Sequence, residues 1–233
     1  MHLRFCDDAA AFRTESRQVA IHVPNEFPGA SLCQRRALAA KAATQGRLVP
    51  SATRHRSRNA LTQIRTARLE LTAATIPLSE AELSDRAAFA RLLGAQVPAE
   101  WPPETAADAL PLFLGWLREH PEWYRWLAWY GVRVTGTERV LVGGCGFLGG
   151  PDETGMVEMG YSVLPQFQRQ GIATEMVEAL IAWAFENASV SRIEADTSPD
   201  NAGSWRILAR AGFIAAGPGR EPGSVRLRRE RSA

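Results

Sequence analysis

The residues best suited to chemistry lie in the segment Gln168-Arg-Gln-Gly-Ile-Ala173, between a predicted strand and a predicted helix. The start of a helix leaves its first backbone N–H groups without partners and carries partial positive charge, so it binds phosphate where a ligand can come close. Gly171 and Ala173 are small enough to allow that approach, and Arg169 adds a cation beside it. The segment therefore predicts a binding site for a diphosphate.

Two common nucleotide-binding loops do not fit this segment. No Gly-Lys-Ser/Thr sequence follows, as the phosphate-binding loop of nucleotide hydrolases requires, and the Gly-x-Gly-x-x-Gly fingerprint of dinucleotide-binding folds is absent. Taken alone, the segment also fits an ordinary strand–helix turn that contains a glycine. The residues downstream are needed to choose between the two interpretations.

A strand and a helix should position this loop. Tyr161 and Val163 alternate with smaller or polar neighbours, as in a half-buried strand, and Pro165 should end that strand. After the loop, apolar residues recur at steps of three and four and predict an amphipathic helix; they are Ile172, Met176, Val177, Leu180, Ile181 and Ala184.

The same patterns predict the other elements. Ser79 and Glu82 have the spacing of a capping box, with Ser79 as the N-cap of a helix that ends near Leu93 at Gly94. A second helix is expected over about 106–117 and a third over 202–211, with Gly212 as its C-terminal stop. Strands are expected at 68–72, 123–130, 140–147, 156–164, 192–197, 213–216 and 224–228.

This order of elements, together with three motifs, resembles the GNAT superfamily of acetyl-CoA-dependent N-acetyltransferases. The motifs are Val157-Glu-Met-Gly-Tyr161, the loop 168–173, and Asn201-Ala-Gly-Ser204 followed by Leu208 and Gly212-Phe213. The resemblance covers about residues 64–230 and is greatest to the branch of ribosomal-protein N-terminal acetyltransferases. It implies an α/β (α+β) fold in which a mixed, mostly antiparallel sheet splays between its fourth and fifth strands, with helices on both faces.

The resemblance also implies acetyl-CoA as the cosubstrate. The molecule would lie in the gap between the strand that ends at Leu164 and the strand of Ile193, with its diphosphate on the loop. Asn201 would hold the cofactor arm, although asparagine is equally well suited to cap the helix that follows, and both roles can coexist. The cofactor-binding residues implied are Val163, Leu164, Gln168, Arg169, Gln170, Gly171, Ile172, Ala173 and Asn201.

Two residues are candidates for catalysis. Glu158 alternates with apolar neighbours and so points to the other face of its strand; desolvation beside the cleft would raise its pKa, which suits a general base. The alternative is that Glu158 pairs with an arginine and only fixes packing. Many family members have a tyrosine as general acid where this chain has Ala209. Ser204 is a candidate substitute, or else simply a serine in the first turn of a helix.

The implied function is transfer of an acetyl group to a primary amine, on a protein N-terminus or on a small molecule, by direct attack on the thioester. The acceptor pocket would be formed by the loop around Trp101 and the strand of Trp126. The alternative is a CoA-binding sensor or scaffold without turnover, which the missing tyrosine would permit.

Charge divides the chain into two parts. The net charge is +2, but residues 1–60 have an excess of basic residues and residues 61–233 an excess of acidic ones. Residues 1–60 also lack sustained periodicity, which predicts a disordered extension before an acetyltransferase domain at 61–233, or a start-site artefact. A nucleic-acid-binding arm is disfavoured because the basic residues lack interleaved aromatic residues.

The remaining composition favours a cytoplasmic protein. The cysteines are Cys6, Cys33 and Cys145, scattered and without metal-ligand spacing, so no metal is expected. The longest apolar run contains a proline and is too short to span a bilayer, so no membrane association is expected. Apolar strand edges and the tryptophans near residue 126 fit a core or a homodimer interface equally well, so the oligomeric state is left open.

Overall fold

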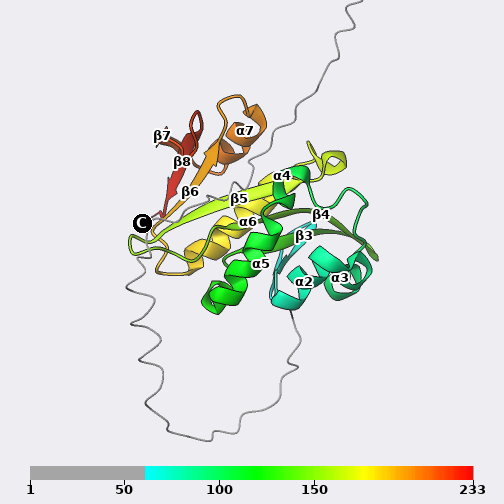
Figure 1. Ribbon diagram of the computed structural model, residues 1–233. Helices are drawn as coiled ribbons and strands as arrows, with labels where there is room; N and C mark the ends of the chain where they lie inside the picture. Colours follow the sequence, from blue (N-terminus) through cyan, green and yellow to red (C-terminus); the bar gives the residue numbers. More distant parts are fainter. Residues whose placement is uncertain (1–60, 233) are drawn as a thin grey trace, which may run out of the picture.

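The computed structural model describes residues 61–232 as a mixed sheet with helices on both faces (Figure 1). The predictions for residues 1–60 lie outside the described residues. In chain order the elements are β1 (Gln63–Arg65), β2 (Leu69–Ala73), α2 (Ile76–Ser84), α3 (Arg86–Leu93), α4 (Glu104–Ala107), α5 (Leu110–Glu119), the 3-10 turn η1 (Pro121–Trp123), β3 (Ala128–Thr135), β4 (Glu138–Phe147), β5 (Met156–Val163), the 3-10 turn η2 (Pro165–Phe167), α6 (Ile172–Glu186), β6 (Arg192–Thr197), α7 (Ala202–Arg210), β7 (Ile214–Pro218) and β8 (Val225–Glu230).

The strands form one sheet in the order β1-β2-β3-β4-β5-β6-β8-β7. Among the described strands, β5 and β6 are the parallel pair, and the other neighbours run antiparallel. The predicted mixed, mostly antiparallel sheet is confirmed. No helix within residues 61–232 is both long and apolar enough to cross a membrane.

The helix α6 forms for the reason that its sequence pattern suggested. Met176 and Leu180 are fully buried against the sheet, and each such side chain contributes about 1.5–3 kcal/mol of hydrophobic stabilisation. Alternate residues of β5, including Tyr161 and Val163, point into the same core. Glu158 therefore points to the opposite face, as predicted.

The first predicted helix differs in its caps. The structure begins α2 at Ile76 with Thr75 as N-cap, so Ser79 lies inside the helix. Asp85 then interrupts the helix, because its carboxylate accepts hydrogen bonds from the amides of Ala87 and Ala88 and caps α3 instead. The predicted capping box at Ser79 is wrong, because Thr75 and Asp85 are the residues that cap the two helices.

The aromatic strand predicted at 123–130 also begins too early. Pro121–Trp123 forms a 3-10 turn, and Arg125 has a φ of 75°, which is incompatible with an extended strand. Trp126 precedes β3 and lies against Trp183 of α6, with ring centroids 4.9 Å apart. The helix predicted at 106–117 is similarly divided into α4 and α5.

Candidate active site

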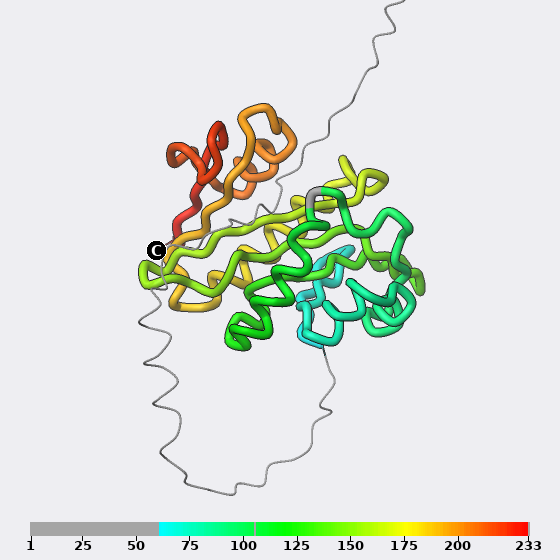
Figure 2. Tube along the Cα trace, viewed as in Figure 1, coloured from blue at the N-terminus to red at the C-terminus, as the bar shows by residue number. Residues whose placement is uncertain are grey.

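The strands β5 and β6 are joined only at their beginnings. Met156–Glu158 pairs with Arg192–Glu194, and beyond this point the register ends. Figure 2 shows the two strands separating from that common start. Residues 159–163 of β5 therefore have no strand partner on this side among residues 61–232, and such an edge can bind an extended ligand through its backbone.

The predicted phosphate-binding loop lies next to this opening. Gly171 is the N-cap of α6 with a φ of 78°, and no side chain in the described part of the chain caps the first turn. Arg169 also has a positive φ, of 58°. The first amides of α6 are therefore not capped by a side chain, and the exposed Arg169 lies beside them. This is the geometry of an anion-binding site.

Arg68, between β1 and β2, holds the loop 168–173 in place through hydrogen bonds. Its Nη1 donates to the Gln170 carbonyl at 2.9 Å, and its Nε donates to Glu175 of α6 at 2.7 Å. Burial would raise the pKa of Glu175, but hydrogen bonds from Thr66 and Arg68 together lower it. The loop is thus held by a charged side chain that the sequence analysis did not identify.

Val163 and Leu164 each have a backbone group that is already hydrogen-bonded within the protein. The Val163 carbonyl accepts a hydrogen bond from Gln168 Nε2 at 3.0 Å, which ties the end of β5 to the loop. The Leu164 amide donates to Val142 of β4 at 2.9 Å, and its side chain is fully buried. Leu164 therefore shapes the site through packing, since its amide is already used.

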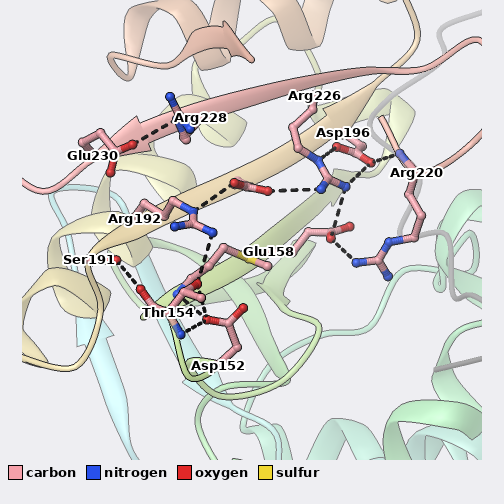
Figure 3. Close-up of polar contacts among 12 residues, drawn as sticks. Asp152, Thr154, Glu158, Ser191, Arg192, Asp196, Arg220, Arg226, Arg228 and Glu230 are labelled. Atoms are coloured by element: carbon pink, nitrogen blue, oxygen red, sulfur yellow. Dashed lines mark hydrogen bonds and ion pairs between the residues drawn. The ribbon is translucent and has the colours of Figure 1, made fainter. Parts of the chain in front are cut away.

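Glu158 lies where β5 and β6 begin to part (Figure 3). Its Oε2 is 2.5 Å from Arg220 Nη2 and 3.7 Å from Arg226 Nη2. Burial raises the pKa of Glu158, and the charge of Arg220 partly opposes this rise. The carboxylate is therefore both desolvated and paired with arginine, so it combines the two interpretations that the sequence left open.

The surrounding charges are paired with one another. Arg226 of β8 holds Asp196 through two hydrogen bonds, of 2.7 and 2.9 Å, and reaches Glu194 at 3.2 Å. Burial would raise the pKa of Asp196, but the hydrogen bonds from Arg226 and from the Arg220 amide lower it. The loop that carries Arg220 is tightly packed at Gly219, where a Cβ would lie 2.1 Å from the Ser224 hydroxyl and 3.0 Å from Asp196 Oδ2.

The helix α7 places the third motif over the opening. Asn201 is its N-cap and accepts from the Ser204 amide at 3.1 Å, and both side chains are buried. The predicted capping role of Asn201 is confirmed, whereas its contact with a cofactor stays a prediction. Ser204 lies in the first turn, as its alternative interpretation held, while Ala209 is exposed on the same helix.

Two buried hydroxyls in this region have no hydrogen-bond partner among residues 61–232: Tyr161 Oη on β5 and Thr197 Oγ1 at the end of β6. Native proteins provide hydrogen-bond partners for nearly all buried polar groups, so an unpaired buried hydroxyl indicates a site where a bound molecule supplies the partner. Together with the open edge of β5 and the uncapped start of α6, they fit a ligand that has a diphosphate and an amide-containing arm, as acetyl-CoA has.

Comparison with known proteins agrees with this geometry. Residues 76–214 match the family described as the acetyltransferase (GNAT) domain. The chain is 36% identical over 151 residues to the uncharacterized N-acetyltransferase YjdG of Bacillus subtilis (strain 168), covering 65% of this chain and 89% of that protein. The chain belongs to the GNAT acetyltransferase family, and the predicted acyltransferase class, with acetyl-CoA as cosubstrate, is confirmed at the level of the family.

Solved structures support the fold. One is the acetyltransferase of Salmonella typhimurium that modifies the N-terminal serine of 50S ribosomal subunit protein L7/L12, with a TM-score of 0.51, 18% identity, and coverage of 73% of this chain and 100% of that one. Another is the microcin C7 self immunity acetyltransferase MccE in complex with acetyl-CoA and AMP, with a TM-score of 0.50, 14% identity, and coverage of 71% and 94%. At such identities the likeness shows the fold alone.

The loop around Trp101 does meet the strand that follows Trp126, since the ring centroids of Trp101 and Tyr130 of β3 are 6.2 Å apart. Trp126 itself lies in the core on the α6 side. The acceptor pocket expected from this loop and this strand stays a prediction. Sequence reasoning missed Arg220 and Arg226. The alternation of arginines along β8 was the available signal, but it does not reveal which acidic residues they meet.

Proposed function

We propose that this protein transfers an acetyl group from acetyl-CoA to the α-amine of a protein N-terminus or of another monoamine. The observation that carries the proposal is the opening between β5 and β6, which has the uncapped start of α6 at one end and Glu158 at the other. A thioester bound along the β5 edge would meet an amine that enters beside Glu158.

Glu158 is proposed as the general base. The attacking amine must lose a proton, and a desolvated carboxylate accepts one more readily than an exposed carboxylate does. An α-amine has a pKa near 8, against about 10.4 for a lysine side chain, so one glutamate acting through a water molecule suits it better. The N–C bond forms, the C–S bond breaks with its electron pair on sulfur, and Glu158 takes one amine proton.

The charges around Glu158 support a monoamine rather than a polycation. The three carboxylates of Glu158, Glu194 and Asp196 are each in an ion pair, and they are matched by three arginines: Arg220, Arg192 and Arg226. The face that would receive the acceptor therefore has no surplus of negative charge among these residues. A polyamine would need unpaired carboxylates, because each of its ammonium groups must be neutralised.

The first test is thermal melting of the full-length protein with and without acetyl-CoA. A ligand at one hundred times its Kd stabilises by about 2.7 kcal/mol, so we expect a clear rise in Tm. Gly171→Glu should abolish the rise, since it places a carboxylate at the phosphate site. Gly94→Glu is the matched control, because Gly94 also has a positive φ, of 65°, but caps α3 away from the loop.

A Tm rise that survives in Gly171→Glu would move the diphosphate elsewhere, and no rise in the wild type would contradict the proposal. A screen of peptides with free N-termini against amino acids and polyamines should then identify the acceptor by release of CoA thiol. The non-catalytic alternative is permitted by the absence of a hydroxyl at Ala209. It predicts binding of acetyl-CoA without turnover across the whole screen.

A further inference from the structure

Tyr161 has a buried hydroxyl that the described protein leaves without a partner. The side chain is 1% exposed, and no group within residues 61–232 meets Oη with full hydrogen-bond geometry, although the Ser204 hydroxyl lies near enough to lower the pKa of Tyr161. An unpaired buried hydroxyl costs folding free energy that a phenylalanine would avoid. Such a cost is typical of a site where the missing partner arrives with a ligand.

The position of Tyr161 connects this hydroxyl to the opening. It is three residues beyond Glu158, the last β5 residue paired with β6, so it lies where the strands have separated. Its side chain points into the core shared by Ile193 and Ala195 of β6. Thr197 follows these two in the alternation of β6, so the second orphaned hydroxyl flanks the opening from the other strand.

The two faces of β5 therefore carry different chemistry. Glu158 points to the face with the arginines, whereas Tyr161 points to the face covered by α6 and α7. Gly160 contributes no side chain between them. An amine that loses its proton to Glu158 would approach from the first face, and the group displaced from the carbonyl carbon would depart toward the second.

We propose that the Tyr161 hydroxyl donates a hydrogen bond to the thioester sulfur and stabilises the thiolate that forms when the C–S bond breaks. The inference rests on the proposed function and extends it. The electron pair of the broken bond goes to sulfur, one amine proton goes to Glu158, and Tyr161 keeps its own proton. The thiolate is later protonated from solvent.

Tyr161 acts as a hydrogen-bond donor rather than as a general acid. Burial raises the pKa of Tyr161 to about 12, and the neighbouring Ser204 partly opposes the shift. An ordinary thiol has a pKa of about 8.5, so proton transfer from the phenol to the thiolate is unfavourable while the hydrogen bond between them is strong. This arrangement would remove the need for a hydroxyl at the exposed Ala209.

The test measures the thiol pKa of CoA bound to the full-length protein, from thiolate absorbance in the ultraviolet. Desulfo-CoA, which lacks the sulfur, supplies the reference spectrum and so removes the contribution of the protein's own cysteines and tyrosines. We expect the bound thiol to titrate about one pH unit lower in the wild type than in Tyr161→Phe, a tenfold difference in thiolate stabilisation.

Tyr130→Phe is the matched control. Its hydroxyl is buried too, but it donates to Glu82 at 2.6 Å, so its removal should leave the bound thiol unchanged. Without ligand, Tyr161→Phe should retain or raise the Tm, whereas Tyr130→Phe should lower it. A Tm loss in Tyr161→Phe as large as that in Tyr130→Phe would show that the hydroxyl is already engaged and would overturn the inference.

The outcomes separate this inference from the proposed function. Tight CoA binding with the same thiol pKa in the wild type and Tyr161→Phe would overturn the role of Tyr161 alone. No binding of CoA or desulfo-CoA by the wild type would overturn the proposed function, and the inference with it.

Discussion

Two largely buried glutamates, Glu158 and Glu82, are held in opposite ways. Glu158 lies between Arg220 and Arg226, at 2.5 and 3.7 Å. Glu82 of α2 accepts hydrogen bonds from two neutral donors, Trp101 Nε1 at 2.8 Å and Tyr130 Oη at 2.6 Å. Burial raises the pKa of Glu82 to about 7, because neutral donors offset less of the desolvation than a cation does.

The difference shows that basicity and catalytic position are separate properties. Judged by pKa alone, Glu82 is the better base at neutral pH. Its two oxygens, however, are occupied by the aromatic residues that pack α2 on β3, whereas Glu158 lies at the opening of the sheet. We therefore assign the chemistry to Glu158 and a packing role to Glu82, and the experiments below can reverse this assignment.

The largest effect should come from Glu158→Gln measured against Glu82→Gln. Loss of a general base lowers kcat by about 10²- to 10⁴-fold, so we expect that loss for Glu158→Gln with the acceptor identified by the screen. Glu82→Gln should change kcat by less than threefold. Initial rates of CoA release, measured below the Tm of each variant, provide the comparison. A large loss in Glu82→Gln with near-normal turnover in Glu158→Gln would exchange the two roles.

The second-largest effect should be a pH dependence of the free energy of unfolding that Glu82 causes. The pKa of Glu82 is raised from 4.5 to about 7 on folding, so the folded state binds more protons between these values and its stability falls as the pH rises through this window. The loss amounts to about 3 kcal/mol. Urea unfolding at pH 4.5 and 7.5 should show it as a change in the stability difference between wild type and Glu82→Gln, since other groups cancel. A difference independent of pH would mean that Glu82 ionises normally in the folded protein.

The smallest effect should come from Arg220→Ala. Removal of this cation raises the pKa of Glu158 further, so the acidic limb of the kcat/KM profile should move to higher pH and the rate on that limb should fall. Arg118→Ala is the control, because Arg118 forms a pair with Glu80 at the same 2.5 Å but on the exposed surface. If the limb stays in place in Arg220→Ala, the ion pair does not set the basicity of Glu158.

Hydrophobic periodicity in the sequence correctly predicted the elements whose formation depends on residues close together in the chain. The apolar period fixed α6, and the alternation of β6 matched Arg192–Thr197. The prediction failed where neighbouring signals compete, as when Thr75 and Asp85 displaced Ser79 as caps, and where one residue such as Arg125 leaves the extended region. Those outcomes depend on which contact is stronger once the chain has folded.

The candidate site divides in the same way. The loop around Gly171 and the outward direction of Glu158 follow from short-range spacing, so the sequence predicted both. Arg220 is 62 positions from Glu158 along the chain, and no periodicity links the two. The unpaired state of Tyr161 Oη could not be predicted either, because the lack of a partner is a property of the whole core.

The short junction between β5 and β6 has a mechanical consequence. The last third of the sheet, β6 to β8, is attached to the remainder through Met156–Glu158 along its strand edge, together with the packing of α6 and α7. A cosubstrate bound in the opening would contact both sides of it. By mass action, the stabilisation from binding increases as the cosubstrate concentration rises. The strands β6 to β8 would then separate from β5 less often at a high acetyl-CoA concentration than at a low one.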